Sequence, residues 1–511
     1  MNHWARNSKL RGFIAGSLAN AAAGLLSVAL GLLLGVPSPP QLIQEMVTSL
    51  MPAAIAAGII GTFQEATRPL ILSMIAAGWI GSGGLVGTAA SRLHRPTHGM
   101  MFPLAMGLAL WLSAVMVLLP ILSQGFFGVS TPAGAAKHSL LWLLVAASYV
   151  ILLEAFTTSR LTLPVPVLHD AQVAAADRGR RRLVLRLAMG AAGVAVAASL
   201  GRWMWTLASL PSARSGEMTP EVTPTGNFYA VSKNFLDPDV NEAQWNLEIV
   251  GLVERPLILS YRELLELPST EQHLTLMCIS NEVGGDLVGT ALWKGVRLAD
   301  LLARADVRPS TTKVVLTGDD DYSDSFPLEK AQEPNTLLAY HMNGAPLSST
   351  HGFPLRALVP NIYGMKNVKW LKRIEAVDYD FKGYWQQRGW SDEAIIQTTS
   401  RMDLPHPGEQ SQKEASIMGG IAFAGSRGIT RVEVSTDYGE TWLPAEVKDA
   451  LSTNTWVLWL RKWEPTPGRH DLLVRAADGN GELQIEERRR TAPGGAAGYD
   501  LVPVRIVPHS S

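Results

Sequence analysis

The sequence predicts a multi-domain chain with an N-terminal α-helical membrane domain, a mixed α+β domain and a C-terminal β-sandwich of the immunoglobulin type. Three observations support this prediction. Before about residue 210 the chain is apolar and poor in charge, and it contains charge-free segments long enough to cross a bilayer. From residue 227 to 402 short helical and strand patterns alternate irregularly. From residue 403 to 511 alternating strand patterns are separated by turn signals.

The overall composition excludes several classes of protein. The 511 residues are enough for about three domains, and the formal net charge of −1 indicates no general attraction to nucleic acid. The single cysteine excludes an intrachain disulfide framework, a four-cysteine zinc site and a CxxC redox pair. It also excludes a CxxCH haem-attachment motif, so we expect no haem in this chain.

The membrane domain, residues 1–210, is expected to contain about five spans. Four segments carry no charged residue or only Glu154: 12–36, 69–91, 99–122 and 139–158. Each is close to the ~20 apolar residues that a helix needs to cross a bilayer. The fifth segment starts at Leu183, and its Arg186 and Arg202 lie near the ends, where long side chains reach the interface. Glu154 is either a functional acid within a span or a residue near the cytoplasmic surface.

The distribution of basic residues predicts the orientation. With five spans and a cytoplasmic N-terminus, the basic clusters all lie inside, as the positive-inside rule requires. Segment 46–64 is long enough to be a sixth span, but Pro52 interrupts it. Both the five-span topology and a six-span topology with an outside N-terminus place everything after residue 210 outside the cytoplasm. We therefore expect a multi-pass protein of the cell membrane with extracytoplasmic catalytic domains.

The fifth predicted span opens with a candidate export signal. Residues 181–186, RRLVLR, contain two arginines, two hydrophobic residues after one intervening position, and a further basic residue. This order resembles a twin-arginine export signal, which serves domains that fold before they cross the membrane. The alternative is an ordinary cytoplasmic basic flank.

The soluble half begins after a linker at residues 211–226, which is rich in Pro, Ser, Thr and Gly. In the α+β domain, WNLEIVGLV (245–253) alternates like a strand and SYRELLELP (260–268) is typical of a short capped helix. In the last domain, the segments from Ile429, Thr455 and Gly468 have the alternation of sandwich strands.

The lone cysteine, Cys278, lies between a strand-like run and a glycine-rich loop, in the segment TLMCISNEVGGDLVGT. Such a junction can present a ligand to a cleft. A thiolate there is a soft metal ligand or a nucleophile, and a nucleophile would need a base such as His341 or His351. The flanks of known cysteine hydrolases are absent. The remaining alternative is a small buried hydrophobic residue.

Four long segments resemble the sulfite oxidase family of molybdopterin-dependent oxidoreductases. They are TLMCISNEVGGDLVGTALWKGVRLADLL (275–302), LLAYHMNGAPLSSTHGFPLRALVPNIYGMKNVKWLKRIEAV (337–377), GYWQQRGWSDEA (383–394) and GSRGITRVEVSTDYGETW (425–442). The resemblance covers residue 227 to about 507, and by it the chain is identified as a bacterial, membrane-anchored member. It implies a single molybdenum bound to a pyranopterin dithiolene that ends in a phosphate, with soft sulfur ligands.

The resemblance also implies roles for particular residues. Cys278 would be the metal ligand. The residues implied to bind the cofactor are Tyr229, Asn234, Asn281, Asp319, His351, Arg356, Asn367, Val368 and Lys369. Those implied to act at the substrate are Tyr322, Lys233 and Arg427, with Arg431 an alternative to Arg427 as a strand residue.

One departure from the family pattern concerns the substrate. Sulfite-oxidising members have arginine, asparagine and histidine after an aromatic pair, whereas this chain has FYAVSKNF, with Lys233, Asn234 and Phe235. Lysine lacks the planar fork that holds an oxyanion at two points. We therefore expect sulfite-oxidase-like oxygen-atom transfer on a small oxyanion or oxide. The alternatives are a quinol-fed reductase of S-oxides or N-oxides, such as methionine sulfoxide, and a non-catalytic membrane sensor.

The expected partners follow from these features. With no haem in the chain, electrons would pass to or from a separate carrier, either a cytochrome or a quinone. The lipid bilayer would contact the helical domain, and a homodimer could form through the β-sandwich. No nucleic-acid partner is expected.

Overall fold

The computed structural model describes residues 2–50, 67–93, 101–122, 126–128, 134–158, 217–234, 237–408, 410–411 and 416–507. The chain divides into two compact units. One is helical and comprises residues 1–46 and 68–211, and the other comprises residues 47–67 and 212–511. Each unit is described by itself below.

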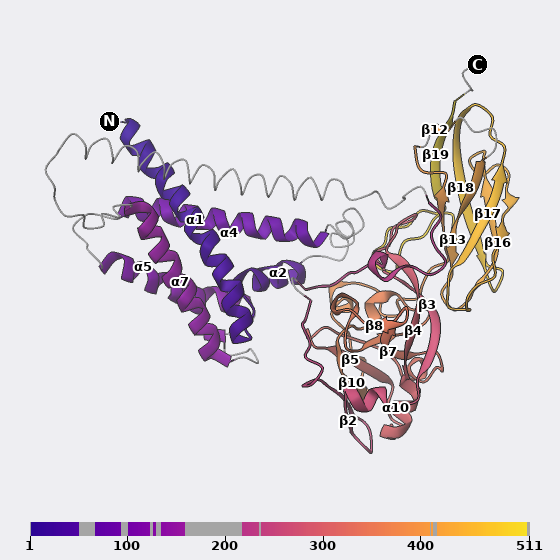
Figure 1. Ribbon diagram of the computed structural model, residues 1–511, viewed down its shortest axis with the longest axis horizontal. Coiled ribbons are helices and arrows are strands. Elements are labelled where there is room, and N and C mark those ends of the chain that lie inside the picture. The colour runs from indigo at the N-terminus through magenta and orange to yellow at the C-terminus, as the bar shows by residue number, and fades with distance from the viewer. Residues whose placement is uncertain are drawn as a thin grey trace. The chain divides into compact units, whose positions relative to one another are not determined.

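The helical unit consists of helices, drawn in indigo to purple in Figure 1. Its elements are α1 (Asn2–Leu34), α2 (Pro39–Leu50), α4 (Thr67–Leu93), α5 (Met101–Ser113), the π-helix η3 (Ala114–Leu118), α6 (Leu119–Ile121), η4 (Phe126–Gly128) and α7 (Gly134–Thr158).

Small residues bring α1 and α4 together. A Cβ atom at Gly16 or Gly87 would overlap backbone atoms of the other helix, so only glycine permits this approach. Polar side chains then bond across the contact: Trp79 Nε1 donates to the carbonyl of Asn20 at 2.8 Å. Tyr149 on α7 donates to the carbonyl of Gly83 at 2.8 Å. These bonds therefore satisfy the Trp79 indole and the Tyr149 hydroxyl inside the helical unit.

Within the described ranges, three helical segments are long and apolar enough to span a membrane: Gly12–Gly31, Met101–Ile121 and Ala135–Thr157. They coincide with the first, third and fourth predicted spans. The second predicted span, 69–91, lies in α4, which is a 27-residue helix but is not among these three. The fifth predicted span and the possible export signal lie outside the described residues, as does most of segment 46–64.

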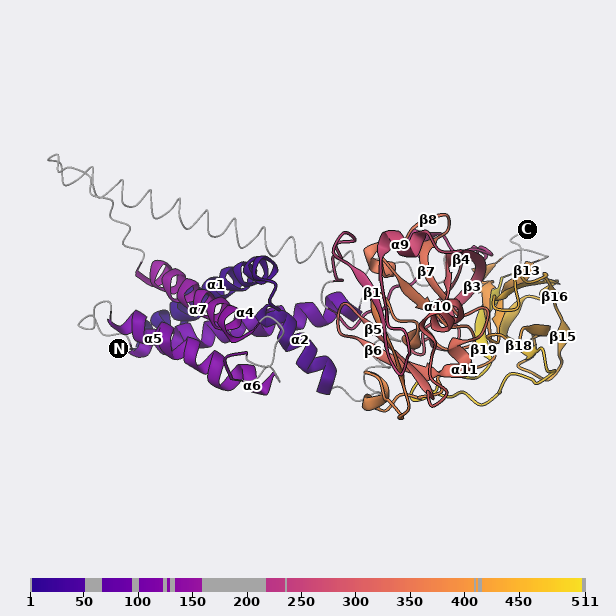
Figure 2. The ribbon, with the colours of Figure 1, turned by 90° about the horizontal axis from the view of Figure 1, so that it is seen from below.

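The mixed domain contains two five-stranded sheets (Figure 2). The first has the order β2-β1-β10-β5-β6, in which only β1 and β10 are parallel. Its strands are β1 (Asn246–Gly251), β2 (Leu257–Ser260), β5 (Lys313–Gly318), β6 (Ser323–Pro327) and β10 (Leu371–Val377). The second has the order β3-β4-β7-β8, with β9 also paired to β7. Its strands are β3 (Thr270–Met277), β4 (Val288–Arg297), β7 (Leu337–Met342), β8 (Ala345–Pro346) and β9 (Arg356–Leu358).

Short helices connect these strands. They are α9 (Tyr261–Leu265), α10 (Leu298–Ala305), α11 (Leu328–Ala331) and the 3₁₀ turns η5 (Thr225–Asn227), η6 (Ser349–His351), η7 (Gly364–Lys366) and η8 (Gln386–Arg388). The predicted capped helix is confirmed, because Ser260 and Glu263 form a capping box at the start of α9. In α10, Leu298, Leu301 and Leu302 share the buried face, as helical spacing requires.

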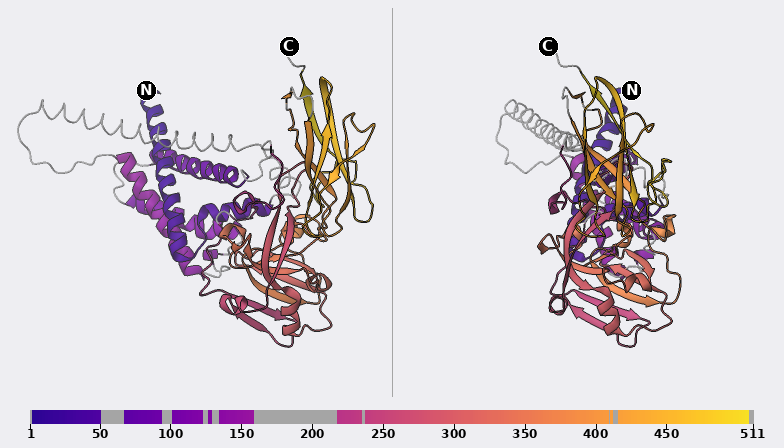
Figure 3. Two further views of the ribbon diagram at one scale, coloured as in Figure 1. Left: turned by 45° about the vertical axis from the view of Figure 1, so that its right-hand side comes forward. Right: turned by 90° about the vertical axis from the view of Figure 1, so that its right-hand side faces the viewer.

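The C-terminal domain is a sandwich of two sheets (Figure 3, yellow tones), and this prediction is confirmed. One sheet has the order β11-β13-β17-β16 and the other β12-β19-β18-β14-β15. The strands are β11 (Thr399–Leu404), β12 (Gln410–Ser411), β13 (Ser416–Phe423), β14 (Ile429–Ser435), β15 (Leu443–Pro444), β16 (Glu446–Val447), β17 (Val457–Trp463), β18 (Gly468–Asp478) and β19 (Asp500–Ile506). Both sheets contribute to one core, for example through Trp459 and Val474. The immunoglobulin type stays a prediction.

The sandwich is hydrogen-bonded to the strand that leads to the cysteine. Thr275 on β3 donates from its backbone N–H to the carbonyl of Asn454 at 3.0 Å, and its hydroxyl accepts from the N–H of Trp456 at 2.9 Å. Arg401 donates to the carbonyl of Gly285 at 2.9 Å. The sandwich thus supports both sides of the loop that contains Cys278.

Candidate active site

A cavity in the mixed domain contains the cysteine and most of the predicted site residues. It encloses about 880 Å³ of space free of protein atoms, including its open mouth. Its wall consists of residues 228–233, 278–280, 350–351, 364–365 and 367–370, with Asp320, Tyr322, Arg356, Trp385 and Trp390. Segments far apart in the sequence therefore meet here, because the loops of both sheets converge on this point.

Cys278 follows the last residue of β3 directly. Its backbone N–H donates to the carbonyl of Leu287 at 2.9 Å, which closes the glycine-rich loop, and Asn281 Oδ1 accepts from the N–H of Leu287 at 2.9 Å. Burial raises the pKa of the Cys278 thiol, although hydrogen bonds from Ser280 oppose this. A thiolate at this position therefore needs a cation such as a metal.

The structure does not support a cysteine nucleophile. His341 lies on β7 and does not line the cavity. His351 lines the cavity, but its Nε2 is bonded to the carbonyl of Thr225 at 3.1 Å. Neither histidine is in contact with the Cys278 thiol as a base would have to be.

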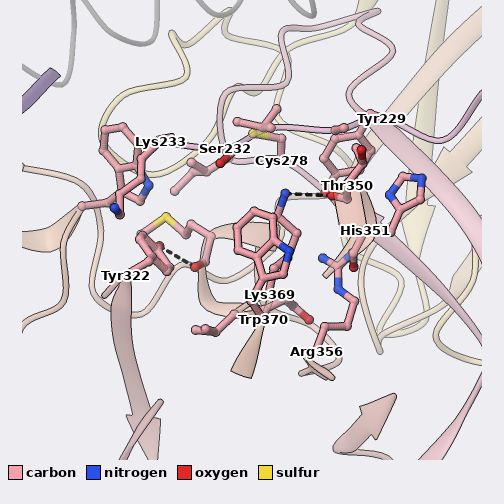
Figure 4. Close-up of a pocket in the computed structure, with 18 of the residues that line it drawn as sticks. Tyr229, Ser232, Lys233, Cys278, Tyr322, Thr350, His351, Arg356, Lys369 and Trp370 are labelled. Carbon is pink, nitrogen blue, oxygen red and sulfur yellow. Dashed lines mark hydrogen bonds between the residues drawn. The ribbon is translucent and has the colours of Figure 1, made fainter. Parts of the chain in front are cut away.

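The polar side chains form two groups on opposite sides of Cys278. In Figure 4, Lys233 and Tyr322 lie on the left and His351 and Arg356 on the right, with Cys278 between the two groups at the top. The two sides differ in charge balance, so each is suited to a different chemical group.

On the side with Arg356, the guanidinium is buried and has no acidic partner among the residues that the structure describes. Arg356 is 6% exposed, and its Nη1 donates to the carbonyl of His351 at 3.2 Å. Its guanidinium lies 5.4 Å from the centre of the Trp293 ring, and its Nε has no hydrogen-bond partner in the described part of the chain. Burial lowers the pKa of Arg356 to about 10. A buried charge of this kind requires a counter-charge, so an anionic group of a ligand fits here.

His351 and Lys369 complete this side. Burial, and then the charge of Arg356, lower the pKa of His351 to about 4, so its ring is neutral near pH 7. Lys369 Nζ donates to the carbonyl of Thr350 at 3.0 Å and lies 4.3 Å from the centre of the Trp370 ring. A phosphate would find a guanidinium and an ammonium here as charged donors. The neutral His351 ring already directs its one N–H to Thr225, so it would donate to a phosphate only after taking up a proton at Nδ1.

On the side with Lys233, the charges are paired. Lys233 Nζ lies 3.7 Å from Asp320 Oδ2, and the two side chains are only 12% and 6% exposed. The same ammonium donates to the carbonyl of Asp320 at 2.9 Å and to Asn234 Oδ1 at 3.0 Å. Asn234 in turn donates to Asp320 Oδ2 at 2.7 Å. This side therefore offers little net charge to a ligand.

Tyr322 is the other polar residue of this side. Its hydroxyl donates to the carbonyl of Met365 at 2.6 Å and lies 3.3 Å from Asp324 Oδ2. Burial, and then the charge of Asp324, raise the pKa of Tyr322 well above its usual value. The phenol is therefore protonated in the neutral range, and it can donate to a ligand when its O–H turns away from the carbonyl of Met365.

Four of the predicted site residues do not line the cavity. They are Asn234, Asn281, Asp319 and Arg427. Asn234 and Asn281 hold neighbouring segments through the bonds given above. Asp319 is exposed and points to Lys372, whose Nζ is 3.8 Å away.

Arg427 is engaged elsewhere. It donates to Asp478 Oδ2 at 2.9 Å, to the carbonyl of Ile396 at 3.0 Å and to Thr398 Oγ1 at 3.2 Å. These bonds tie the sandwich to the end of the mixed domain. The alternative, Arg431, pairs with Glu433 at 3.1 Å and is also outside the cavity.

Sequence reasoning missed several residues of the site. Asp320 occupies the cavity instead of Asp319, and Trp385 and Trp390 form apolar wall. In the run DDDY only the turn decides which acid points inward: Asp321 has a left-handed backbone with φ of 58°, and Asp320 accepts from the N–H of Tyr322 at 3.1 Å. No signal in the sequence distinguishes the first two acids of this run.

Asn367 and Val368 lie where the resemblance placed them, at the cavity wall. The side chain of Asn367 is occupied with backbone groups: it accepts from the N–H of Val359 at 2.7 Å and donates to the carbonyl of Tyr363 at 3.2 Å. It therefore shapes the loop that surrounds the cavity, and its side-chain amide has little capacity left for a ligand.

The protein offers one thiolate and no cluster of metal ligands. Among the described residues, no group of three or more His, Cys, Asp or Glu could hold a metal ion. A metal at Cys278 must therefore receive its other ligands from a cofactor. Together with the unpaired Arg356, this donor set fits a metal-bearing cofactor with a terminal anion.

Comparison with known proteins agrees with this geometry. Residues 234–385 match the family described as oxidoreductase molybdopterin binding domain, and residues 392–494 match the Mo-co oxidoreductase dimerisation domain. The mitochondrial sulfite oxidase of Drosophila melanogaster is 32% identical over 319 residues, which is 52% of this chain and 55% of that protein. The Homo sapiens enzyme is 32% identical over 301 residues, 50% of this chain and 55% of that protein. This chain thus spans about half the length of these relatives.

Two further similarities concern bacterial proteins. The uncharacterized oxidoreductase YuiH of Bacillus subtilis is 31% identical over 179 residues, 35% of this chain and 88% of that protein. The crystal structure of the sulfane dehydrogenase SoxCD from Paracoccus pantotrophus has a TM-score of 0.52 and 24% identity, and it covers 57% of this chain and 83% of that one. The latter likeness shows the fold alone.

The fold and the cavity define a molybdopterin-dependent oxidoreductase, and the chain belongs to the sulfite oxidase family. Its cofactor is Mo-molybdopterin. The predictions of family, enzyme class and cofactor are therefore confirmed, and the alternative of a non-catalytic sensor does not hold.

Proposed function

We propose that this enzyme transfers an oxygen atom, with two electrons, between water and a small substrate at the molybdenum of its cofactor. In this proposal Cys278 binds the metal, and Arg356, His351 and Lys369 bind the phosphate of the pterin. The cofactor supplies the redox chemistry, and the protein supplies position and electrostatics. The side of the cavity with Lys233 and Tyr322 is then left for the substrate.

The observation that carries the choice of substrate is the pairing of Lys233 with Asp320 at 3.7 Å. An anion such as sulfite would meet a cation that already has a nearly buried carboxylate beside it. The negative charges of sulfite and Asp320 repel each other in this partly buried site, so sulfite would bind more weakly. The pair thus disfavours sulfite and leaves a neutral S-oxide or N-oxide as the better fit.

The walls of this side agree with a neutral substrate. Trp385 and Trp390 line the cavity, together with Met365. Aromatic and thioether groups bind small apolar substituents. Tyr322 is partly buried and protonated, so it can donate to the oxygen of an oxide while the aromatic groups hold its substituents.

Purified enzyme tests this function directly. Dimethyl sulfoxide, methionine sulfoxide and trimethylamine N-oxide would be offered with reduced benzyl viologen, and sulfite with ferricyanide. We expect turnover of at least one neutral oxide with a higher kcat/KM than that of sulfite. A Cys278→Ser preparation controls for reactions that do not need the metal ligand. A clear preference for sulfite would refute the choice of a neutral oxide.

Sulfite oxidation is the second candidate, because relatives that match half of this chain are named sulfite oxidases. Lys233 still places one ammonium in the cavity. Under this candidate the Asp320 carboxylate would have to move away from Lys233 when sulfite binds.

We further propose that the helical unit anchors the enzyme in the cell membrane, with the catalytic unit outside the cytoplasm. Three apolar helices and the positions of the basic residues support this. A separate cytochrome or quinone would exchange electrons with the metal. The sandwich supports a homodimer: Ile417 on β13 and Leu460 on β17 are 51% and 43% exposed and share the outer face of one sheet.

A further inference from the structure

A buried pair of opposite charges, Asp324 and Lys366, touches the tyrosine of the cavity. The two side chains are each 1% exposed, and Lys366 Nζ lies 2.8 Å from Asp324 Oδ1. The Tyr322 hydroxyl lies 3.3 Å from the other oxygen, Asp324 Oδ2. Buried ion pairs often stabilise a protein no more than apolar residues of the same size. Stability alone therefore gives no reason for this pair at this position.

The pair continues to the protein surface. Lys366 Nζ lies 3.4 Å from Asp392 Oδ1, and the side chain of Asp392 is 31% exposed. Asp392 is also bound by Lys382 at 2.7 Å and by Lys313 at 3.1 Å. An unbroken series of hydrogen-bonding groups therefore leads from the cavity to solvent.

The hydrogen bonds along this series are fully used. Asp324 Oδ1 accepts from Lys366 and from the N–H of Ser325, and Oδ2 accepts from Gln386 at 3.2 Å and lies in reach of Tyr322. Lys366 donates to Asp324, to the carbonyl of Ser325 at 2.6 Å and to Asp392. The Tyr322 hydroxyl has one hydrogen and two acceptors, Met365 O and Asp324 Oδ2. A rotation of this O–H changes its acceptor without moving any heavy atom.

We propose that Asp324, Lys366 and Asp392 form a proton relay that connects Tyr322 with solvent during the reaction. The proposal rests on the proposed oxygen-atom transfer, which needs protons at the substrate. In the reduction of an oxide the X–O bond breaks and the oxygen leaves as water. The bound cofactor would supply two electrons, received from a separate cytochrome or quinol, and solvent would supply two protons.

The chain's own residues move those protons one at a time. Tyr322 gives its hydroxyl proton to the departing oxygen. Lys366 gives a proton to the Asp324 carboxylate, which passes it on to the Tyr322 oxygen. Lys366 then regains a proton that water delivers through Asp392. Every residue returns to its starting state after each proton. In the oxidation of sulfite the same transfers run in the opposite direction, so the relay does not depend on which substrate is used.

The proton affinities at the inner end of the relay agree with this role. At the outer end, burial is outweighed by hydrogen bonds from Lys382 and Lys313, which lower the pKa of Asp392 to about 2, so Asp392 only passes on a proton that comes from water. Burial raises the pKa of Asp324, although Lys366 and the N–H of Ser325 oppose the shift. Burial and the neighbouring Asp324 raise the pKa of Tyr322. Both oxygens thus hold protons more readily than the same groups in water, as proton carriers near neutral pH should.

The first test removes both buried charges at once with Asp324→Asn/Lys366→Gln, so that no unpaired charge is left inside. Activity would be measured with dimethyl sulfoxide or with sulfite, whichever the wild-type enzyme turns over. We expect kcat to fall by about 100-fold, the lower range for a lost acid–base group, with KM within about threefold. The solvent deuterium isotope effect on kcat should rise, and added formic acid or imidazole should restore part of the rate.

A second readout does not depend on turnover. With 3-fluorotyrosine incorporated and the Tyr322 resonance assigned by Tyr322→Phe, ¹⁹F NMR of the holoenzyme follows the ionisation of this phenol. Removal of the Asp324 charge should move that ionisation to lower pH. If the wild type turns over neither substrate, the proposed function fails, whereas this measurement still decides whether Asp324 and Tyr322 are coupled.

Asp392→Asn interrupts the relay at its exposed end, where the substitution does not disturb the core. It should lower kcat severalfold and raise the isotope effect. The matched control, Glu433→Gln/Arg475→Gln, removes a 2.8 Å ion pair of the sandwich with 17% and 19% exposed side chains. The proposal would be overturned if the relay variants kept their full cofactor content and had the same kcat as this control. An unchanged Tyr322 ionisation, or a loss of rate that small acids do not restore, would also overturn it.

Discussion

The pairing of Lys233 with Asp320 makes a quantitative prediction about substrate choice. Asp320→Asn removes the carboxylate but keeps an oxygen that accepts from the N–H of Tyr322, so the turn should persist. The ammonium of Lys233 then lacks its partner at 3.7 Å. A small anion should bind more tightly, whereas a neutral oxide should bind about as before.

The magnitude follows from the geometry. In the wild type an anion near the pair is attracted by Lys233 and repelled by Asp320, and the two effects nearly cancel. Without the carboxylate, an anion about 5 Å from the ammonium gains about 3 kcal/mol at an effective dielectric constant of about 20. Desolvation takes part of this gain, which leaves about 1.5–3 kcal/mol, the range for hydrogen bonds to charged groups. The sulfite KM, or its Ki if sulfite is only an inhibitor, should therefore fall about 10- to 100-fold.

The assay compares sulfite and dimethyl sulfoxide on the wild type and on two variants. Asp319→Asn is the matched control, since it makes the same change of charge one residue away on an exposed side chain outside the cavity. A sulfite constant that changes equally in both variants would show that overall charge, and not the pair, controls binding. A sulfite constant unchanged by Asp320→Asn would place the anion site elsewhere and refute the reasoning.

Four further predictions concern single features of the molecule. Cys278→Ser should abolish turnover and lower the molybdenum content. Fluorescence of the released pterin should show most of the pterin still bound, because in our proposal Arg356 and its neighbours bind the phosphate. Full activity of this variant would refute Cys278 as the metal ligand. Lys233→Arg should lower the sulfite KM about tenfold through bidentate hydrogen bonds and change the KM of neutral oxides little. Reporter fusions after Gly201 should report the outer face and fusions near Ala175 the cytoplasm; a cytoplasmic C-terminal unit would refute the charge argument. In cofactor-free protein the pKa of His351 is about 4 in the folded state, whereas its ordinary value of 6.5 applies to the unfolded state. Between pH 6.5 and 4 the unfolded state therefore binds more protons than the folded state, and the free energy of unfolding falls as the pH drops. Denaturant titrations should show a loss of about 3 kcal/mol over that window, and His351→Gln should remove it.

Several features of the site were predictable because they depend on neighbours in the chain. Cys278 follows the strand pattern of β3 and precedes a glycine-rich loop, and the structure places it at that junction. His351 and Arg356 are only five positions apart, on η6 and at the start of β9. Residues this close in the sequence stay close in the fold, so the resemblance to the family could already place these two on one side of the cavity.

The substrate side depends on contacts that are distant in the sequence. Lys233 reaches Asp320 across 87 positions, and Asp324 reaches Lys366 across 42. Which acid of the run DDDY enters the cavity is decided by the left-handed conformation of Asp321. Propensity and pattern carry no information on such a choice, because either acid would be equally compatible with a polar turn.

The sequence by itself thus determined the class of the protein and its cofactor, through long motifs that resemble a known family, and it placed Cys278 between a strand and a loop through local alternation. Only the tertiary structure decided the charge balance around the substrate. It paired Lys233 with Asp320, buried Lys366 behind Tyr322, and engaged Arg427 in bonds between the two domains of the catalytic unit. The physical reason is that the effective charge of a side chain is set by the groups it meets after folding, and those groups come from loops whose conformations the packed sheets determine.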